Sequence, residues 1–317
     1  MVLSIGEILV DIFVDGNNKT VFPGGAPFNV ASNISNFNGD ISFYGAVGND
    51  EYGKFLLDFA HKNLNNVYID KIENRDTTQA IVTLDNGERS FKFVRDNGSD
   101  YILDVSNLSK FDLNNVKIVH IGSLMLSYEK GRKFFFEAVK YVHEHSKALV
   151  SFDVNYRDDI FSSEKEAKEI FLSALKEADI VKFTEEELEL LTSQKNLLEA
   201  LKSILNDKQV AVVTFGKDGS LFYSKDLYVE VPTYKLTPID TTGAGDAFYS
   251  YFLYAFDKGF DLANKEEIKN CLLRANIAGG LATQKKGAID VVPSLDEIEE
   301  LIKKHNFWNN ICQIKKY

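Results

Sequence analysis

The sequence predicts an α/β fold in which a doubly wound, mostly parallel sheet is flanked by helices. Short apolar runs rich in β-branched and aromatic residues alternate with longer segments of helical period, the order expected of strands joined by crossover helices. One pair of strand-like runs is instead joined by a short turn, which predicts a small antiparallel addition. The chain has 317 residues, 44% of them hydrophobic, so it can bury a large core.

The β-α alternation is clearest in the middle of the chain. Four apolar runs are predicted to be strands, at 118–121, 148–152, 180–183 and 210–214. Three amphipathic stretches are predicted to be helices, at 133–145, 164–177 and 197–205. Each stretch is long enough for a crossover between parallel strands, so the segment predicts one sheet with helices packed against it.

The antiparallel addition is predicted near residue 85. Residues 79–84 and 89–94 are strand-like and are joined by Asp-Asn-Gly-Glu at 85–88, which predicts a β-hairpin. Together with residues around 10–22, this hairpin is expected to form a small inserted sheet. We therefore expect one domain over 1–317, with a lid formed by about 10–22 and 75–104; a plain surface hairpin is the alternative.

Composition and charge exclude several classes of function. The chain carries 47 acidic and 36 basic residues, a net charge of −11, which is unsuited to neutralising a nucleic-acid backbone. No apolar run reaches the ~18 residues that span a bilayer, and no basic segment precedes the first apolar run, so a cytoplasmic protein is expected. Cys271 and Cys312 lack partners at metal-ligand spacing, so neither a disulfide framework nor a zinc site is expected.

The strongest functional signal is Asp-Thr-Thr-Gly-Ala-Gly-Asp at 240–246, which precedes an apolar run of helical length at 247–256. Glycines at the start of a buried helix let the backbone approach an anion, and the free N–H groups there favour a phosphate. Asp246 would repel that phosphate, so we expect it to accept a proton from an attacking hydroxyl. A helix cap is the alternative for an isolated Asp, but the flanking glycines favour a catalytic base.

Two motifs in this order resemble those of a known family. The segment Asp-Thr-Thr-Gly-Ala-Gly-Asp-Ala-Phe at 240–248 resembles the C-terminal motif of the ribokinase-like (PfkB) sugar kinases, and Gly-Gly-Ala-Pro-Phe-Asn-Val-Ala at 24–31 resembles their N-terminal motif. By order and spacing, the resemblance extends from residue 6 to residue 288. It implies a ribokinase-like fold and an ATP-dependent sugar kinase that uses Mg²⁺.

The resemblance also implies roles for individual residues. Asp246 matches the catalytic base, with the anion hole formed by the amides of Gly243, Ala244 and Gly245. The implied sugar-binding residues are Asp11, Gly24, Gly25, Asn29, Arg95, Asn155 and Arg157. The implied ATP-binding residues are Lys182, Thr214, Gly216, Gly219, Gly243, Gly245 and Asn276. Independently of the family, Asp11 ends an apolar strand, where a carboxylate needs donors such as those of a polyol.

Metal binding is implied at two places. Thr-Glu-Glu-Glu-Leu at 184–188 resembles an Asn-x-x-Glu element whose glutamate, here Glu187, helps to hold Mg²⁺ through water; Thr184 stands at the asparagine position. Without the resemblance, glutamates at a helix start are usually solvated. The carbonyl groups near Asp240 and Thr242, with the loop 285–288, resemble a monovalent-cation site, so activation by K⁺ is a hypothesis.

The expected substrate is D-fructose, phosphorylated at its 6-hydroxyl. The segments 87–91, 93–95, 120–123 and 151–157 together look most like bacterial fructokinases. Ribose and 2-keto-3-deoxygluconate are the alternatives, and Arg157 or Arg95 could pair with the carboxylate of the latter. A phosphosugar is disfavoured because the segment 79–94 offers only Arg89 and Lys92 as cations.

The sequence fits two other classes of function less well than a kinase. A nicotinamide dehydrogenase would carry Gly-x-Gly-x-x-Gly after its first strand, and residues 6–11 contain no such motif. A non-catalytic sugar or nucleotide sensor is disfavoured because Asp246 is present. The resemblance further allows a homodimer in which two lids pair, with small-molecule sugar and ATP as the partners.

Overall fold

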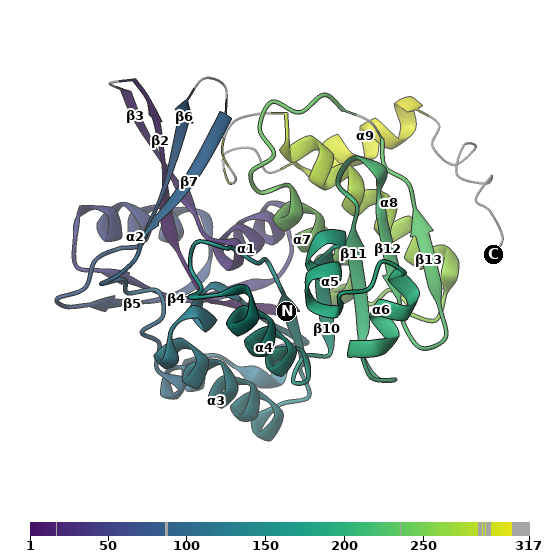
Figure 1. Cartoon of the computed structure of the whole chain (residues 1–317), viewed down its shortest axis with the longest axis horizontal. Helices are drawn as coiled ribbons and strands as arrows, with labels where there is room; N and C mark the ends of the chain where they lie inside the picture. Colours follow the sequence, from purple (N-terminus) through teal and green to yellow (C-terminus); the bar gives the residue numbers. More distant parts are fainter. Residues whose placement is uncertain are drawn as a thin grey trace.

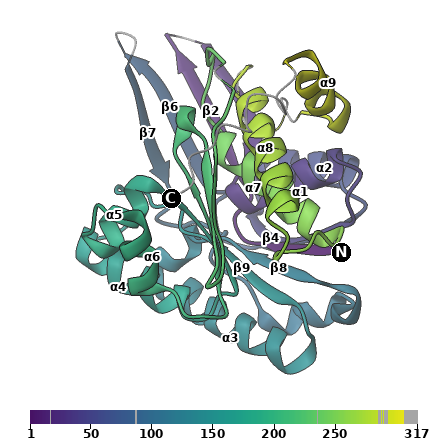
Figure 2. The ribbon, with the colours of Figure 1, turned by 90° about the vertical axis from the view of Figure 1, so that its right-hand side faces the viewer.

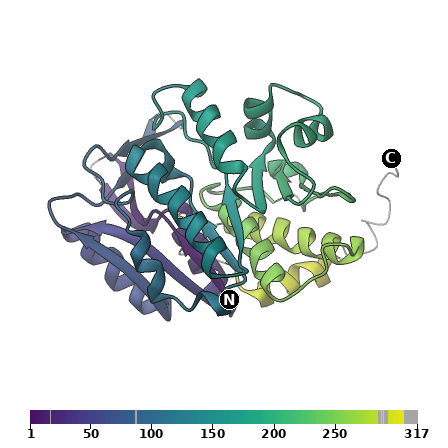
Figure 3. The same ribbon diagram turned by 90° about the horizontal axis from the view of Figure 1, so that it is seen from below.

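A computed structural model describes residues 1–16, 18–85, 88–234, 236–284, 287, 289 and 293–305. The described chain forms a large sheet covered by helices and a small sheet that projects from it (Figure 1). Figure 3 shows the purple and blue N-terminal segment and the green and yellow C-terminal segment at opposite ends of the molecule. The predicted α/β class is confirmed.

The large sheet has the strand order β13-β12-β11-β10-β9-β8-β1-β4-β5 within the described residues. The strands from β5 to β11 in this order are parallel, whereas β12 and β13 add antiparallel pairs at one edge. Their bounds are β1 Val2–Ile5, β4 Ile41–Gly48, β5 Asn66–Ile72, β8 Ile118–Ile121, β9 Leu149–Asp153, β10 Ile180–Thr184, β11 Val210–Thr214, β12 Ser220–Tyr223 and β13 Tyr228–Val231. All four predicted strands are present.

Helices cover both faces of this sheet, with a separate hydrophobic core on each side (Figure 2). One core contains residues of α1 Ala26–Asn36, α2 Glu51–Asn63, α7 Ala244–Asp257, α8 Lys265–Ala282 and α9 Leu295–His305. The other contains residues of α3 Glu129–His145, α4 Glu164–Leu175, α5 Glu185–Thr192 and α6 Leu197–Ile204. Short 3-10 turns lie at η1 Val105–Lys110, η2 Leu113–Asn115, η3 Leu124–Ser127 and η4 Gly216–Asp218.

Helix α3 shows how the sequence produces this arrangement. Its buried residues, Gly131, Phe134, Phe135, Ala138, Val139 and Val142, recur every three or four positions and form one apolar stripe. The helix begins at Glu129, four residues before the predicted start at 133. Its first turn is less apolar than its middle, so the hydrophobic pattern alone placed the start too late.

The small sheet contains β2 Leu9–Asp15, β3 Asn18–Gly24, β6 Gln79–Asp85 and β7 Glu88–Val94, in the order β3-β2-β6-β7. The predicted hairpin is confirmed as the antiparallel pair β6–β7; Asn86 and Gly87 of its turn lie outside the described residues. The hairpins β2–β3 and β6–β7 join through a parallel pair of β2 with β6. Two segments far apart in the sequence therefore build one appendage.

Over the described ranges, no helix is long and apolar enough to cross a membrane. The same residues contain no group of three or more His, Cys, Asp or Glu side chains that could hold a metal ion. Cys271 is a free, buried thiol, and Cys312 lies outside the described residues.

Candidate active site

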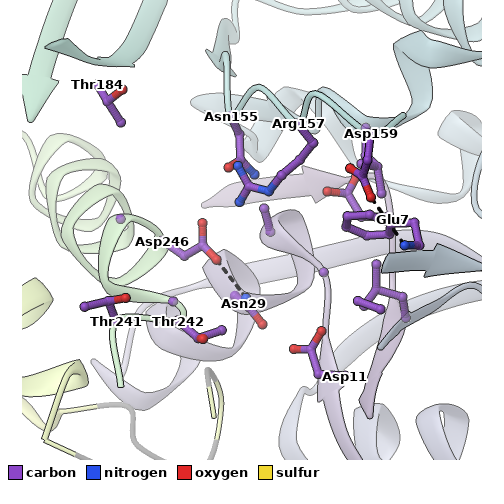
Figure 4. A pocket seen from close by; sticks show the side chains of 18 of the residues that line it. Glu7, Asp11, Asn29, Asn155, Arg157, Asp159, Thr184, Thr241, Thr242 and Asp246 are labelled. Carbon is purple, nitrogen blue, oxygen red and sulfur yellow. Dashed lines mark hydrogen bonds between the residues drawn. The ribbon is translucent and has the colours of Figure 1, made fainter. Parts of the chain in front are cut away.

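A cavity of about 550 Å³ opens at the carboxyl ends of the parallel strands, beside the small sheet. It lies next to β1, whose neighbours β4 and β8 lie on opposite sides, and such reversals of strand order are where α/β sheets bind ligands. Figure 4 shows the lining side chains. The polar ones are Glu7, Asp11, Asn29, Asn155, Arg157, Asp158, Asp159, Lys182, Thr184, Glu187, Thr241, Thr242 and Asp246.

Asp246 lies in the first turn of α7 and points into this cavity (Figure 4). Its Oδ2 accepts a hydrogen bond from Nδ2 of Asn29 at 2.7 Å. Gly243 caps the helix with a left-handed φ of 76°, a conformation that favours glycine. The amide of Ala244 donates to the carbonyl of Thr241 at 3.3 Å, whereas those of Gly245 and Asp246 have no partner within the described chain. These two amides are available to an anion.

Burial raises the pKa of Asp246 above its usual range, and the charge of Asp153 raises it further. The hydrogen bond from Asn29 and the charges of Lys182 and Arg157 act in the opposite direction. A carboxylate with a raised pKa is a stronger base, so this environment suits a group that must accept a proton.

Buried hydrogen bonds fix α7 against the sheet. The hydroxyl of Tyr249 and Oγ of Ser151 on β9 lie 2.6 Å apart, and Nδ1 of His120 on β8 lies 3.1 Å from the same Oγ. All three side chains are buried. The position of Asp246 at the start of α7 is therefore set by contacts one helical turn further along.

Lys182 lies directly beside the start of α7. Its Nζ donates to both carboxylate oxygens of Asp153, each at 2.8 Å, and both side chains are almost fully buried. The ion pair follows from strand register, because Lys182 on β10 is the direct neighbour of Asp153 on β9. A Cβ added to Gly245 would lie 3.6 Å from Nζ. The positive charge of the ammonium group is therefore close to the free amides and would help them to bind an anion. Sequence reasoning placed Lys182 near ATP but missed this partner.

Asp11 reaches the cavity from β2 of the small sheet. Gly24, which pairs with Leu9 across the β2–β3 hairpin, has no room for a side chain, because a Cβ there would collide with the Asp11 carboxyl. Gly25 has a φ of 106°, and a Cβ there would collide with the carbonyl of Glu7. These two glycines allow the small sheet, the start of α1 and the segment after β1 to pack closely together. Gly25 also lines the cavity.

Burial raises the pKa of Asp11 from 3.8 to about 7, and the charges of Asp246 and Asp240 add to this effect, whereas Arg157 opposes it. The folded state therefore binds more protons than the unfolded state between pH ~4 and ~7, and the free energy of unfolding falls as pH rises through this window.

We therefore expect Asp11→Asn to lose part of this pH dependence, by about 1.4 kcal/mol for each pKa unit removed. Urea unfolding at pH 5 and pH 8 would measure it, with the surface substitution Asp58→Asn as control. Identical pH dependence in the wild type and Asp11→Asn would contradict the raised pKa.

The loop after β9 brings Asn155 and Arg157 into the cavity. Asn155 has a φ of 40°, and Arg157 donates to the carbonyl of Tyr156 at 2.8 Å. The alternative role of Arg157 was an ion pair with Asp158 or Asp159. Among the described residues, Arg157 forms neither ion pair. Instead, the carboxyl of Asp159 accepts a hydrogen bond from the Phe93 amide of β7 at 3.4 Å, which links this loop to the small sheet (Figure 4).

Arg95, expected as a sugar contact, is not among the residues that line the cavity. Its guanidinium donates to the buried carboxyl of Asp100 at 2.6 to 3.1 Å and to Ser127 Oγ at 2.5 Å. It also lies over the rings of Tyr101 and Tyr128, at 5.3 and 5.1 Å from their centroids. The side chain anchors the end of β7 to the main body, because its donors are used within the protein.

The other residues expected at the nucleotide lie outside this cavity. Thr214 is the register neighbour of Thr184, which lines it, so the turn containing Gly216 and Gly219 lies one strand further along the sheet. Asn276 is buried on α8, and its Nδ2 donates to the carbonyl of Val231 at 3.1 Å. Asn276 therefore ties α8 to β13.

Glu187 lines the cavity and is held in a fixed orientation. It forms a capping box with Thr184, since Thr184 Oγ1 accepts from the Glu187 amide at 3.2 Å and Glu187 Oε2 accepts from the Thr184 amide at 2.7 Å. Its Oε1 accepts from the Tyr156 amide at 2.8 Å. Each oxygen retains one further acceptor position, which fits a contact to a metal-bound water better than direct ligation.

Asp240 organises the loop before α7. Its Oδ1 accepts from the amide and hydroxyl of Thr242 at 3.0 and 2.8 Å, and its Oδ2 accepts from the Gly287 amide at 3.1 Å. The loop is thus joined to the segment that follows α8. Lys285, Lys286 and Ala288 of the expected monovalent-cation site lie outside the described residues.

Sequence reasoning gave no role to Glu7, which is buried and lines the cavity. A usable signal was present, because Glu7 follows the first apolar strand just as Asn155 follows a later one. The apolar wall formed by Leu9, Ala80, Phe93 and Leu124 was also missed. These residues come from separate elements, and no spacing in the sequence joins them.

Known proteins resemble this chain over nearly its full length. A fructokinase-2 of Oryza sativa subsp. japonica is 34% identical over 322 residues, covering 96% of this chain and 94% of the relative. A probable fructokinase-5 of Arabidopsis thaliana is also 34% identical, over 318 residues, with 96% and 97% covered.

Solved structures also match this chain over nearly its full length. A fructokinase with bound ATP from Xylella fastidiosa matches with a TM-score of 0.87 and 29% identity, covering 96% of this chain and 98% of that one. A Vibrio cholerae fructokinase double mutant with fructose, ADP and potassium ion bound matches with a TM-score of 0.85 and 32% identity, covering 94% and 97%. A family model described as pfkB family carbohydrate kinase matches residues 2–295. This chain therefore belongs to the pfkB family of carbohydrate kinases.

Proposed function

We propose that this chain transfers the γ-phosphoryl group of ATP to the 6-hydroxyl of D-fructose, with Asp246 as the catalytic base. Asp246 takes the proton of the attacking hydroxyl, a new P–O bond forms, and the bond to the leaving ADP breaks. The observation that carries the proposal is the start of α7, where a buried carboxylate and two amides without a partner among the described residues face one cavity. The names of the relatives support fructose as the acceptor.

The side chains around Asp246 divide into two functional groups. Asp11 and Asn29, with Asn155 and Arg157, are suited to hydrogen-bond a polyol. Lys182 and the amides of Gly245 and Asp246 are suited to neutralise the transferring phosphoryl group. The small sheet carries Asp11, so its closure over the main body would complete the sugar site and exclude water, a competing nucleophile.

Magnesium and a monovalent cation belong to the same proposal. Bound Mg²⁺ would neutralise charge on the phosphates, and Glu187 would orient one of its waters. The potassium ion bound in the Vibrio cholerae structure supports a role for a monovalent cation, which we place beside the loop of Asp240 and Thr242. We expect activity to fall when K⁺ is replaced by tetramethylammonium at constant ionic strength; unchanged activity would count against a monovalent-cation role.

The proposed activity is tested by a coupled ADP-release assay with ATP and Mg²⁺. The acceptor panel contains D-fructose, ribose, 2-keto-3-deoxygluconate, adenosine and fructose 6-phosphate. We expect the highest kcat/KM for D-fructose and identification of the product as fructose 6-phosphate by NMR. Preference for 2-keto-3-deoxygluconate would retain the mechanism and assign Arg157 to its carboxylate, whereas no ADP release with any acceptor would favour a sensor.

A further inference from the structure

Glu7 lines the cavity at the carboxyl end of β1. It follows β1, the strand at which the order of the large sheet reverses, and it is 2% exposed. Its carboxyl packs against Gly122, the residue after β8, where an added Cβ would lie 2.6 Å from Oε2. The backbone carbonyl of Glu7 also packs against Gly25 at the start of α1. The residue is therefore held by three elements that meet at the strand ends.

The carboxyl of Glu7 is incompletely satisfied. Its Oε2 is buried and has no hydrogen-bond partner among the described residues. Buried polar atoms normally have a partner, so an exception in a cavity wall indicates a place where a ligand supplies the missing bond. The guanidinium of Arg95, whose charge acts on Glu7, is engaged by Asp100 and Ser127 instead.

The position of Glu7 relative to Asp246 indicates which part of a ligand it would meet. Figure 4 shows Glu7 and Asp159 on one side of the pocket and Asp246 with Thr241 and Thr242 on the other. A sugar whose reacting hydroxyl lies at Asp246 would extend its remaining hydroxyl groups across the cavity. Glu7 would then meet a hydroxyl remote from the one that is phosphorylated.

We propose that Glu7 is a specificity-determining residue whose carboxyl group hydrogen-bonds a hydroxyl of the sugar remote from the phosphorylated one. The proposal rests on the sugar-kinase function proposed above and deepens it. Asp11 and Asn29 then contact the sugar near the reacting end, and Glu7 contacts it at the far end.

The environment of Glu7 sets the direction of this hydrogen bond. Burial raises the pKa of Glu7 to about 8, and the charges of Asp100 and Asp246 add to the effect, whereas the hydrogen bond to its own backbone and the charge of Arg95 oppose it. The other charged groups that line the same cavity are Asp11, Arg157, Asp158, Asp159, Lys182 and Glu187. Below pH ~8 the carboxyl keeps its proton and can donate it to a sugar oxygen, whereas the ionised form can only accept.

The test compares Glu7→Leu and Glu7→Gln with the wild type in steady-state kinetics. Removing the polar atoms in Glu7→Leu should raise KM for fructose about 10-fold and leave KM for ATP within about twofold. The amide of Glu7→Gln is a permanent donor, so this variant should retain a near-normal KM for fructose at pH 7. In the wild type, we expect the KM for fructose to rise above pH 8. In Glu7→Gln, this rise should be absent.

Two further measurements separate contact from structure. For the wild type, kcat/KM should be lower for the monodeoxy analogue of fructose that lacks the hydroxyl bound by Glu7. Glu7→Leu should show no such loss with this analogue, because the contact is already absent. Ser99→Ala is the matched control, since Ser99 Oγ is also buried and unpartnered but does not line the cavity. It should change neither KM.

The outcomes distinguish the two proposals. A wild type that does not phosphorylate fructose counts against the proposed function. A wild type that does so, with a Glu7→Leu variant that keeps its KM and its discrimination among the deoxy analogues, overturns the Glu7 contact alone. Equal losses in kcat and both KM values, with a lowered Tm and no recovery in Glu7→Gln, would assign Glu7 to folding and also overturn it.

Discussion

Asp246→Asn should lower kcat by about 100-fold or more, because the amide cannot accept the proton of the attacking hydroxyl. The substitution is nearly isosteric, and the side-chain oxygen can still accept the hydrogen bond that Nδ2 of Asn29 donates to Asp246. The amides of Gly245 and Asp246 belong to the backbone and remain in place. Nucleotide affinity should therefore change little, so the effect should appear in kcat.

Rapid-quench measurement of one turnover, together with calorimetric binding of ADP, would test this expectation. Asp58→Asn on the surface of α2 is the control for loss of one negative charge. Raised pKa values at Asp246 and Asp11 also predict that the wild-type rate increases with pH as these groups lose their protons. Normal turnover in Asp246→Asn would remove Asp246 from the mechanism.

Lys182→Met should destabilise the protein by about 3–5 kcal/mol, the usual cost of leaving one member of a buried ion pair without its partner. Asp153 is 4% exposed, and both of its carboxylate oxygens bind Lys182 Nζ. Burial alone would lower the pKa of Lys182, but Asp153 and Glu187 raise it, so the ammonium form is the one removed. Chemical denaturation at pH 7 would measure the loss.

The double variant Lys182→Met/Asp153→Leu separates folding from catalysis. Replacing both members of a buried pair with apolar residues is often neutral or stabilising, so most of the lost stability should return. If Lys182 also neutralises the transferring phosphoryl group, kcat should remain low in the double variant. Recovery of both stability and kcat would show that Lys182 acts only through the fold.

The sequence by itself determined the fold class and indicated the chemistry that we propose for Asp246. The largely apolar runs 118–121 and 210–214 became β8 and β11 with the predicted bounds, because a strand buried on both faces is mostly apolar. The glycines around Asp246 indicated an anion site, because the close approach of the backbone to an anion depends on the conformation of a few neighbouring residues. Local physical constraints of this type are visible in a short stretch of sequence.

Tertiary structure decided the rest of the site. Strand register placed Lys182 beside Asp153, and the order of the sheet placed Glu7 at its reversal point. The folded chain also gave Arg95 its protein partners, which are the carboxyl of Asp100 and the rings of Tyr101 and Tyr128. An ionisable side chain binds whichever partner the packed chain brings within reach, and those partners come from distant segments. Which carboxylates are paired and which face the cavity is therefore a property of the folded protein.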